Sequence, residues 1–120
     1  MVEKTKRHWR DYKTEGGARP VKKFIDSLQK QDQIEIYAAM KDVKQNGLSV
    51  ARHLDSDIYE VRASGQDKIF RILFATEGKF SQVLLSLEAF TKKTQKTPPA
   101  KIKLAKERLS NWRSRHKDLK

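Results

Sequence analysis

The stretch that decides the fold is 58-IYEVRASGQDKIFRILFATEGKFSQVLLSLEAF-90. It predicts β-strands that are separated by short, glycine-containing turns. The expected strands are 58–63, 68–76 and 80–90, and the expected turns are 64–67 and 77–79. In the middle strand the side chains alternate with a period of two, and Arg71 interrupts an otherwise apolar run. Because turns this short join antiparallel neighbours, we expect a meander.

Two helices are expected before this stretch. The first begins at Arg19-Pro20, because proline suits a first helical turn and apolar residues then recur at helical spacing. Its apolar face consists of Val21, Phe24, Ile25 and Leu28. In the second helix we expect Asp32 to be the N-cap and Asn46-Gly47 to form the end. Its apolar face consists of Ile36, Met40 and Val43. The two helices are expected to form a hairpin.

The remaining segments are less regular. Residues 5–14 predict a weak first strand, and residues 52–55 are expected to form a polar loop. A basic helix is expected to begin at Thr97-Pro98-Pro99, with a frayed tail after residue 112. The apolar stripe of this helix consists of Ile102, Ala105, Leu109 and Trp112.

The expected order of elements is therefore β, α, α, β, β, β, α. This order predicts an α+β fold, an antiparallel sheet with an N-terminal helical hairpin and a C-terminal helix. A length of 120 residues predicts a single domain over 1–120. The absence of cysteine excludes disulfides and thiolate sites and favours a reducing compartment, so we expect a cytoplasmic protein. We expect no membrane partner, because the sequence has neither a long apolar window nor a signal-peptide pattern.

Charge is the strongest compositional signal. Lys and Arg number 27 against 15 Asp and Glu, a net charge of +12. The excess is concentrated at the end, because residues 92–120 hold 11 basic and two acidic residues. A basic surface of this size attracts polyanions, and nucleic acid is the first partner to consider.

Common catalytic patterns are absent from the sequence. The best candidate for a metal site is the acidic group Asp55, Asp57 and Glu60, but acids in a loop before a strand are usually solvated, so we expect no metal. The histidines, at positions 8, 53 and 116, lie in distant segments, and their spacing does not favour an acid/base pair. We find no phosphate-binding glycine loop and no serine or cysteine nucleophile motif, and we expect no small-molecule cofactor.

What is left is a set of basic residues along the predicted sheet. Arg62 ends one strand, Arg71 lies in the middle of the next, and Lys92, Lys93 and Lys96 follow the third. Because sequential strands with short turns are neighbours, these cations are expected on one surface. We expect the Arg71 guanidinium to be exposed among buried neighbours, which would require an anionic partner.

Such a set of cations can cleave RNA without a metal ion. The 2′-hydroxyl attacks the adjacent phosphorus, and arginines stabilise the charge that develops on the phosphoryl oxygens. A lysine among like charges releases its proton more easily, whereas arginine stays protonated. We therefore expect Arg71 to hold the phosphate and Lys93 or Lys96 to act as the base. Further RNA contacts are expected from Lys68, Lys92, Tyr59 and Lys101. Phe90 is expected in the core.

The sequence also resembles a known family. The segments that carry the resemblance are 19-RPVKKFI-25, 58-IYEVR-62, 70-FRILF-74 and, most specifically, 90-FTKKTQKTP-98. They resemble the phage-derived, HigB-like branch of the RelE toxin superfamily over about residues 19–110. The resemblance implies the toxin of a type II toxin–antitoxin system, which enters the ribosomal A site, cuts messenger RNA and inhibits translation and growth. It also implies inhibition by a neighbouring antitoxin with a helix-turn-helix domain, similar to HigA.

The resemblance assigns roles to particular positions. Arg62 falls where a strand lysine or arginine of the family contacts RNA, and Arg71 falls on the strand arginine that contacts the scissile phosphate. Lys93 lies near the basic residue that follows the last strand. The late catalytic tyrosine of well-studied RelE toxins has no counterpart, because the sequence here is 97-TPP-99. Lys96 is our substitute candidate for proton transfer.

Two other classes of function stay open at this point. The chain could be a non-catalytic module that binds nucleic acid through its charge alone. It could also be a protein-targeting inhibitor whose basic face binds an acidic partner, since relatives with this fold include toxins that act on DNA gyrase. An acidic, partly disordered antitoxin segment could cover the basic groove or lie beside the N-terminal helices.

Overall fold

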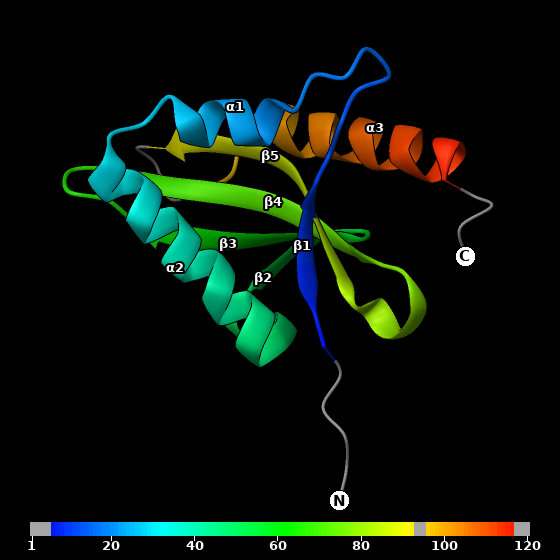
Figure 1. The fold of residues 1–120 in the computed structure, drawn as a ribbon, viewed down its shortest axis with the longest axis horizontal. Helices are drawn as coiled ribbons and strands as arrows, with labels where there is room; N and C mark the ends of the chain where they lie inside the picture. Colours follow the sequence, from blue (N-terminus) through cyan, green and yellow to red (C-terminus); the bar gives the residue numbers. More distant parts are fainter. Residues whose placement is uncertain (1–5, 93–95, 117–120) are drawn as a thin grey trace, which may run out of the picture.

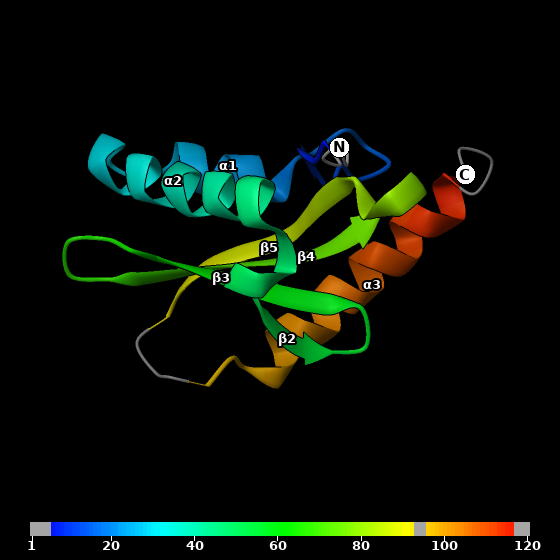
Figure 2. The ribbon, with the colours of Figure 1, turned by 90° about the horizontal axis from the view of Figure 1, so that it is seen from below.

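The computed structural model describes residues 6–92 and 96–116. In chain order its elements are β1 (His8–Asp11), α1 (Pro20–Asp26), α2 (Lys30–Asn46), the 3-10 helix η1 (Gly47–Val50), β2 (Arg52–Asp55), β3 (Ile58–Ser64), β4 (Ile69–Glu77), the 3-10 helix η2 (Lys79–Ser81), β5 (Val83–Lys92) and α3 (Pro99–Arg115). In this part of the chain a five-stranded sheet has the order β1-β5-β4-β3-β2. Helices α1 and α2 cover one face of the sheet and α3 covers the other (Figures 1 and 2). The predicted α+β class is confirmed.

The predicted meander forms the centre of the sheet. Strands β3, β4 and β5 are antiparallel neighbours, and their register places Arg62 opposite Arg71 and Arg71 opposite Phe90. The β3–β4 turn is closed by a hydrogen bond of 2.8 Å from the Gly65 amide to the carbonyl of Lys68. Because register partners share a face, the meander aligns the two arginines on one side of the sheet.

The sheet is mixed, so the prediction of a purely antiparallel sheet is wrong at its first strand. Strand β1 pairs with β5 in parallel, from His8 opposite Val83 to Asp11 opposite Ser86. The predicted polar loop at 52–55 is also wrong, because these residues form β2, antiparallel to β3. At a sheet edge a short polar strand needs a partner on only one side, which explains why its sequence lacks an apolar pattern.

Three predicted boundaries differ from the structure. Strand β5 begins at Val83 rather than residue 80, because η2 turns the chain there and leaves Phe80 exposed at a φ of 59°. The N-cap of α2 is Gln29, while Asp32 is buried in the first turn. The tail was expected to fray after residue 112, but α3 continues to Arg115. The predicted start of α1 at Pro20 and the end of α2 at Asn46-Gly47 are confirmed.

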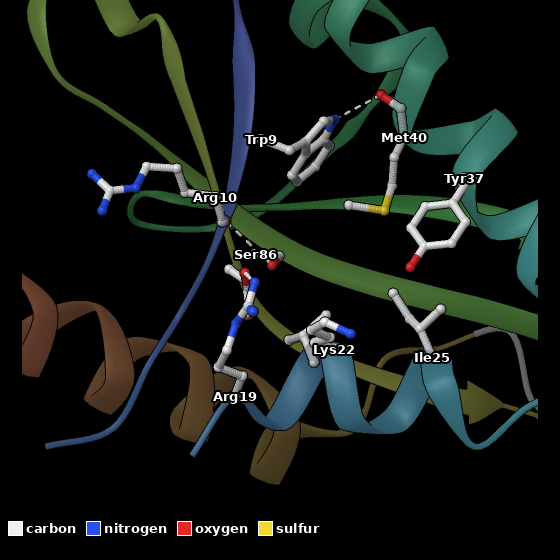
Figure 3. A pocket seen from close by; sticks show the side chains of 10 residues that line it. Trp9, Arg10, Arg19, Lys22, Ile25, Tyr37, Met40 and Ser86 are labelled. Atoms are coloured by element: carbon white, nitrogen blue, oxygen red, sulfur yellow. Dashed lines mark hydrogen bonds and ion pairs between the residues drawn. The ribbon is translucent and has the colours of Figure 1, made fainter. Parts of the chain in front are cut away.

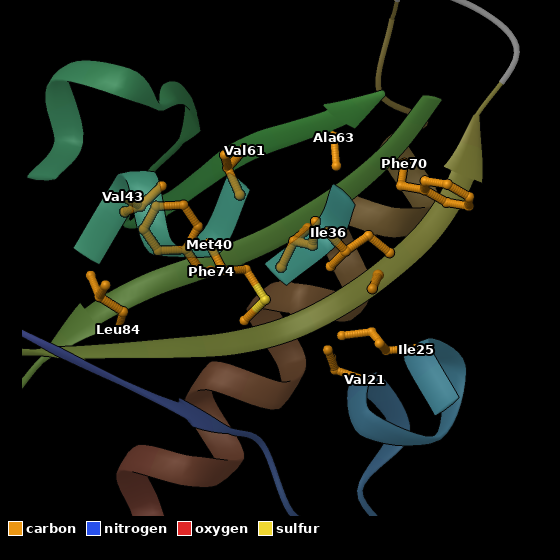
Figure 4. Packing of buried hydrophobic residues seen from close by; sticks show 12 residues of the cluster. Val21, Ile25, Ile36, Met40, Val43, Val61, Ala63, Phe70, Phe74 and Leu84 are labelled. Carbon is orange, nitrogen blue, oxygen red and sulfur yellow. The ribbon is translucent and has the colours of Figure 1, made fainter. Parts of the chain in front are cut away.

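An apolar core fills the space between the sheet and the helices α1 and α2 (Figure 4). Its buried members are Val21, Ile25, Ile36, Met40, Val43, Val61, Ala63, Phe70, Ile72, Phe74, Leu84 and Ala89. The helical residues in this core are those of the predicted apolar stripes. Trp9 of β1 packs against the edge of this core, and its Nε1 donates a hydrogen bond of 2.8 Å to the carbonyl of Met40.

A second core lies between the sheet and α3. Its buried members are Tyr12, Ile58, Leu73, Ala75, Leu85, Leu87, Phe90, Ala105, Leu109 and Trp112. A register shift after Leu73, which pairs with Glu88 while Phe74 pairs with Ser86, leaves Leu87 as an extra residue in β5. Such a bulge changes the alternation of side chains. As a result both Leu87 and Glu88 face α3, one in the core and the other in ion pairs with this helix.

Candidate active site

A buried charged network lies on the sheet face that α3 covers, on the neighbouring strands β3 and β4. The Glu60 carboxylate is its centre. Nη1 of Arg71 donates to both carboxylate oxygens at 3.2 Å, and Nε of Arg62 donates to Oε1 at 3.1 Å. The Thr97 hydroxyl donates to Oε2 of Glu60 and accepts a bond of 3.1 Å from Nη1 of Arg71. One carboxylate therefore holds two arginines and the segment that precedes α3.

The members of this network differ in their access to solvent. The side chains of Glu60 and Arg71 are 0% and 1% exposed, whereas that of Arg62 is 38% exposed. The Arg62 side chain is thus the member of the pair that solvent reaches, whereas the Arg71 side chain is buried. Burial by itself raises the pKa of Glu60, but the hydrogen bonds from Thr97, Arg62 and Arg71 outweigh burial and hold the pKa below its ordinary value. The carboxylate is therefore charged at neutral pH.

The local sequence explains this arrangement. Glu60 and Arg62 are two residues apart in β3 and so point to the same face, and the register brings Arg71 opposite Arg62. Thr97 is fixed because Pro98 is the N-cap of α3 and Pro99 begins the helix. The network thus joins positions that lie 11 and 37 residues from Glu60 in the chain.

A second ion-pair group follows along α3. Glu88 contacts Lys101 at 2.8 Å and Arg108 at 3.3 Å, and Nη1 of Arg108 also donates to the carbonyl of Leu87 at 2.7 Å. The ammonium of Lys101 lies 5.2 Å from the centre of the Phe90 ring. These contacts fix α3 to the sheet bulge at Lys101 and Arg108.

The structure places the predicted catalytic residues as follows. Arg62 and Arg71 are brought together, but the expected exposure of Arg71 is wrong, because Glu60 is the anionic partner that its burial requires. Lys96 is exposed and directly precedes Thr97. Lys93 lies outside the described residues. The backbone of Lys92 pairs with Ile69 at the same end of the sheet.

The predicted RNA contacts are more scattered. Lys101 lies on the α3 face beside Glu88, and Lys68 is exposed in the β3–β4 turn. Lys68 lines a surface hollow of about 520 Å³ that the turn forms with Thr91. Tyr59 lies on the opposite face of the sheet, where its ring packs 5.9 Å from that of Phe74. The structure therefore does not bring Tyr59 to the arginine pair. Phe90 is buried, as predicted.

The acidic residues weighed as metal ligands are separated. Asp55 pairs with Lys106 and Asp57 with Arg113, while Glu60 holds the arginine pair. Within residues 6–92 and 96–116, no group of three or more His, Cys, Asp and Glu side chains could hold a metal ion. The described helices include none that is long and apolar enough to cross a membrane.

Sequence reasoning missed three members of this region. Glu60 was considered only as a metal ligand, Thr97 only as part of a helix start, and Arg52 as part of a loop. Arg52 is exposed in β2 opposite Glu60, and so it lies on the same face of the sheet. The one available signal was the spacing of Glu60 and Arg62, which places an acid beside a base on one strand face.

The fold and this region define a small, basic α+β protein of the RelE-like type, with an arginine pair on the sheet face that α3 covers. Residues 23–110 match the model of the family described as "Phage derived protein Gp49-like (DUF891)", and the chain belongs to this family. The chain is also 31% identical over 108 residues to "Probable endoribonuclease HigB1" of two Mycobacterium tuberculosis strains, CDC 1551 / Oshkosh and H37Rv. Each match covers 88% of this chain and 84% of the relative. The resemblance to HigB-like proteins of the RelE superfamily is thereby confirmed.

Proposed function

We propose that this protein is the toxin of a type II toxin–antitoxin system and that it cuts messenger RNA at the ribosome. The observation that carries the proposal is the arginine pair held by Glu60, with Arg62 facing solvent. Membership in the Gp49-like family and similarity to a probable endoribonuclease support the same class of activity. The net charge of +12 supports RNA as the substrate.

In this proposal Arg62 is the group that touches the scissile phosphate. Its side chain is the exposed member of the pair, and a guanidinium can donate two parallel hydrogen bonds to phosphoryl oxygens. Glu60 and Arg71 act as positioning residues, because they fix the orientation of Arg62 from a buried site. Such prior orientation matters because a donor that is already aligned stabilises the transition state without reorganisation.

The chemical step uses the nucleophile that RNA supplies. The 2′-oxygen forms a bond to phosphorus as its proton leaves, and the bond from phosphorus to the 5′-oxygen breaks as that oxygen gains a proton. The products are a 2′,3′-cyclic phosphate and a 5′-hydroxyl. We assign the proton transfers to Lys93 or Lys96, in or beside the segment that precedes Thr97. The step needs no metal ion in this proposal.

The partners follow from the same proposal. RNA contacts are assigned to Lys68, Lys92 and Lys101 around the end of the sheet that carries the arginine pair. The ribosomal A site presents the message, and a HigA-like antitoxin with a helix-turn-helix domain inhibits the toxin in the cytoplasm.

The test is induction of this protein in a bacterium, with and without the neighbouring gene, followed by mapping of transcript ends by primer extension. We expect new cuts inside translated reading frames that disappear when the neighbouring gene is expressed. Arg62→Ala should abolish the cuts. Arg115→Ala is the matched control, because it removes an exposed arginine at the far end of α3.

Two outcomes would contradict the proposal. Intact transcripts with translation still blocked would favour a protein target. RNA binding by the purified wild-type protein without any cutting of ribosome-bound message would favour a non-catalytic module that binds through charge alone.

A further inference from the structure

Strand β2 brings a third arginine to the sheet face that carries the arginine pair. Arg52 is the register partner of Glu60 across the β2–β3 ladder, and register partners point to the same face of a sheet. The next residue, His53, points the other way, because its ring lies 5.0 Å from that of Tyr59, which packs against the core under α1 and α2. Since neighbouring side chains of a strand alternate, both contacts place Arg52 on the α3 face.

The spacing of Arg52 and Arg62 suits a strand of RNA. Arg62 lies two residues beyond Glu60 on β3, and Arg52 lies opposite Glu60 on β2, so the two arginines are diagonal neighbours. Diagonal neighbours on one sheet face are about 7–8 Å apart. That separation is comparable to the step between successive phosphates of an extended RNA strand. The Glu60 side chain between them is 0% exposed, so its carboxylate does not meet a strand that passes over the surface.

The two exposed arginines differ in their partners. Arg62 is held by Glu60 at 3.1 Å, whereas the Arg52 side chain is exposed and pairs with no carboxylate in the part of the chain that the structure describes. The acid closest to Arg52 along β2 is Asp55, whose carboxylate pairs with Lys106. The charge of Arg52 is therefore available to an anion from outside the chain.

Cations on the opposite face of the sheet are engaged differently. A hollow between α1, α2 and β1 is lined by Arg19 and Lys22 (Figure 3). The Arg19 guanidinium pairs with Asp11 at 2.5 Å. The Lys22 ammonium pairs with Asp26 at 2.6 Å. Carboxylates of the same chain thus balance these two charges, unlike the charge of Arg52.

We propose that Arg52 binds the phosphate next to the scissile one, so that the RNA strand passes over Glu60 from β3 to β2. The inference rests on the proposed function and deepens it, because it adds a binding residue to the reaction assigned to Arg62. Phosphate contacts fix the register of a nucleic acid on a protein. A contact that is equally strong in the ground state and the transition state improves binding and leaves the maximal rate unchanged. Arg52 therefore acts on binding, and Arg62 acts on the chemical step.

The test measures single-turnover cutting of ribosome-bound message over a range of concentrations of the full-length protein. Arg52→Ala should raise the concentration for half-maximal rate by about tenfold and keep the maximal rate within about threefold of wild type. Arg115→Ala is the matched control, because it removes the same charge from an exposed arginine at the far end of α3, and it should change neither quantity. Urea denaturation should show wild-type stability for Arg52→Ala, because the replaced side chain is exposed.

Messages with one uncharged linkage locate the contact. A methylphosphonate replaces the phosphate on one side of the cut or on the other, with hydrogen in place of the 2′-hydroxyl that precedes it. The control message has the same hydrogen and an ordinary phosphate. With the wild-type protein, one of the two linkages should raise the half-maximal concentration as much as Arg52→Ala does. In Arg52→Ala that linkage should have much less effect, because the contact is already lost.

Three results would overturn the inference. They are a wild-type half-maximal concentration in Arg52→Ala, equal losses in Arg52→Ala and Arg115→Ala, and equal effects of the uncharged linkages on wild type and Arg52→Ala. If the wild-type protein cuts no message, the proposed function fails. The phosphate contact is then decided by the affinity of the purified protein for a short single-stranded RNA. Its dependence on salt should be weaker in Arg52→Ala than in wild type, and equal dependence would overturn the contact.

Discussion

The two faces of the sheet are held to their helices in different ways. On the face covered by α1 and α2, the described residues make mainly apolar contacts, and Val21 and Phe74 are examples. On the α3 face, apolar packing is accompanied by carboxylates at Glu60, Glu88 and Glu77, each bound by arginine or lysine. Apolar burial gives stability without direction, whereas ion pairs fix the orientation of particular groups. The first face therefore supports the fold, and the second also orients the groups that we assign to RNA.

The largest effect is expected on the apolar face. Phe74→Ala should lower the free energy of unfolding by about 3–5 kcal/mol, because it removes a fully buried ring that contacts Trp9 and Tyr59. Urea denaturation measures this change. Phe80→Ala, at a position 72% exposed, should change stability by less than about 0.5 kcal/mol. Similar losses in both variants would contradict the assigned core.

The buried charge on the α3 face should give a smaller loss. Glu60→Gln keeps the shape of the side chain but removes the charge that binds Arg71, and should cost about 1.5–3 kcal/mol in urea denaturation. Combining Glu60→Gln with Arg71→Met should restore part of that loss, since replacing a buried pair is milder than breaking it. A double variant less stable than the sum of the two single changes would argue against direct pairing.

The same network predicts a dependence on pH. The pKa of Glu60 is lower in the folded protein than in the unfolded chain. The charged carboxylate therefore makes its full contribution to the free energy of unfolding above the unfolded pKa of about 4.3, and this contribution is lost as the pH falls through the folded pKa. The stability difference between wild type and Glu60→Gln should therefore shrink on acidification. Thermal unfolding at pH 7, 5, 4 and 3 measures it. A constant difference over this range would show that the carboxylate charge is not involved.

The smallest effect is expected for an exposed ion pair on the apolar side. Lys22 and Asp26 lie one turn apart on α1 at 2.6 Å, and both side chains are about half exposed. Lys22→Ala should change the free energy of unfolding by less than about 0.5 kcal/mol, because water screens such pairs. A loss as large as that of Glu60→Gln would remove the distinction between surface and buried pairs on which the comparison of the two faces depends.

The sequence was sufficient to predict the apolar face. The stripes on α1 and α2 and the alternation in β4 follow from local periodicity, and the structure confirms them. The direction of β1 was not predictable in this way, because it depends on a crossover through both helices. Strand β2 is polar, and its pairing is set by the turn to β3 rather than by an apolar pattern.

The candidate site was predicted only in part. Register and short turns were enough to place Arg62 beside Arg71. The burial of Arg71 was missed because its partners, Glu60 and Thr97, lie 11 and 26 residues away, and periodicity carries no information about such contacts. An arginine inside an apolar strand was correctly expected to need an anion, but that anion is a carboxylate of the same chain.

The central claim is that Arg62, the exposed member of the arginine pair, takes part in RNA cleavage. It is tested most directly by the single-turnover rate at which purified Arg62→Ala cuts ribosome-bound message, measured together with its free energy of unfolding. We predict a rate about 100-fold below wild type or lower, as for the loss of one aligned transition-state donor. The unfolding free energy should fall by about 1 kcal/mol or less, because this side chain is 38% exposed. A wild-type rate in a folded Arg62→Ala protein would contradict the account.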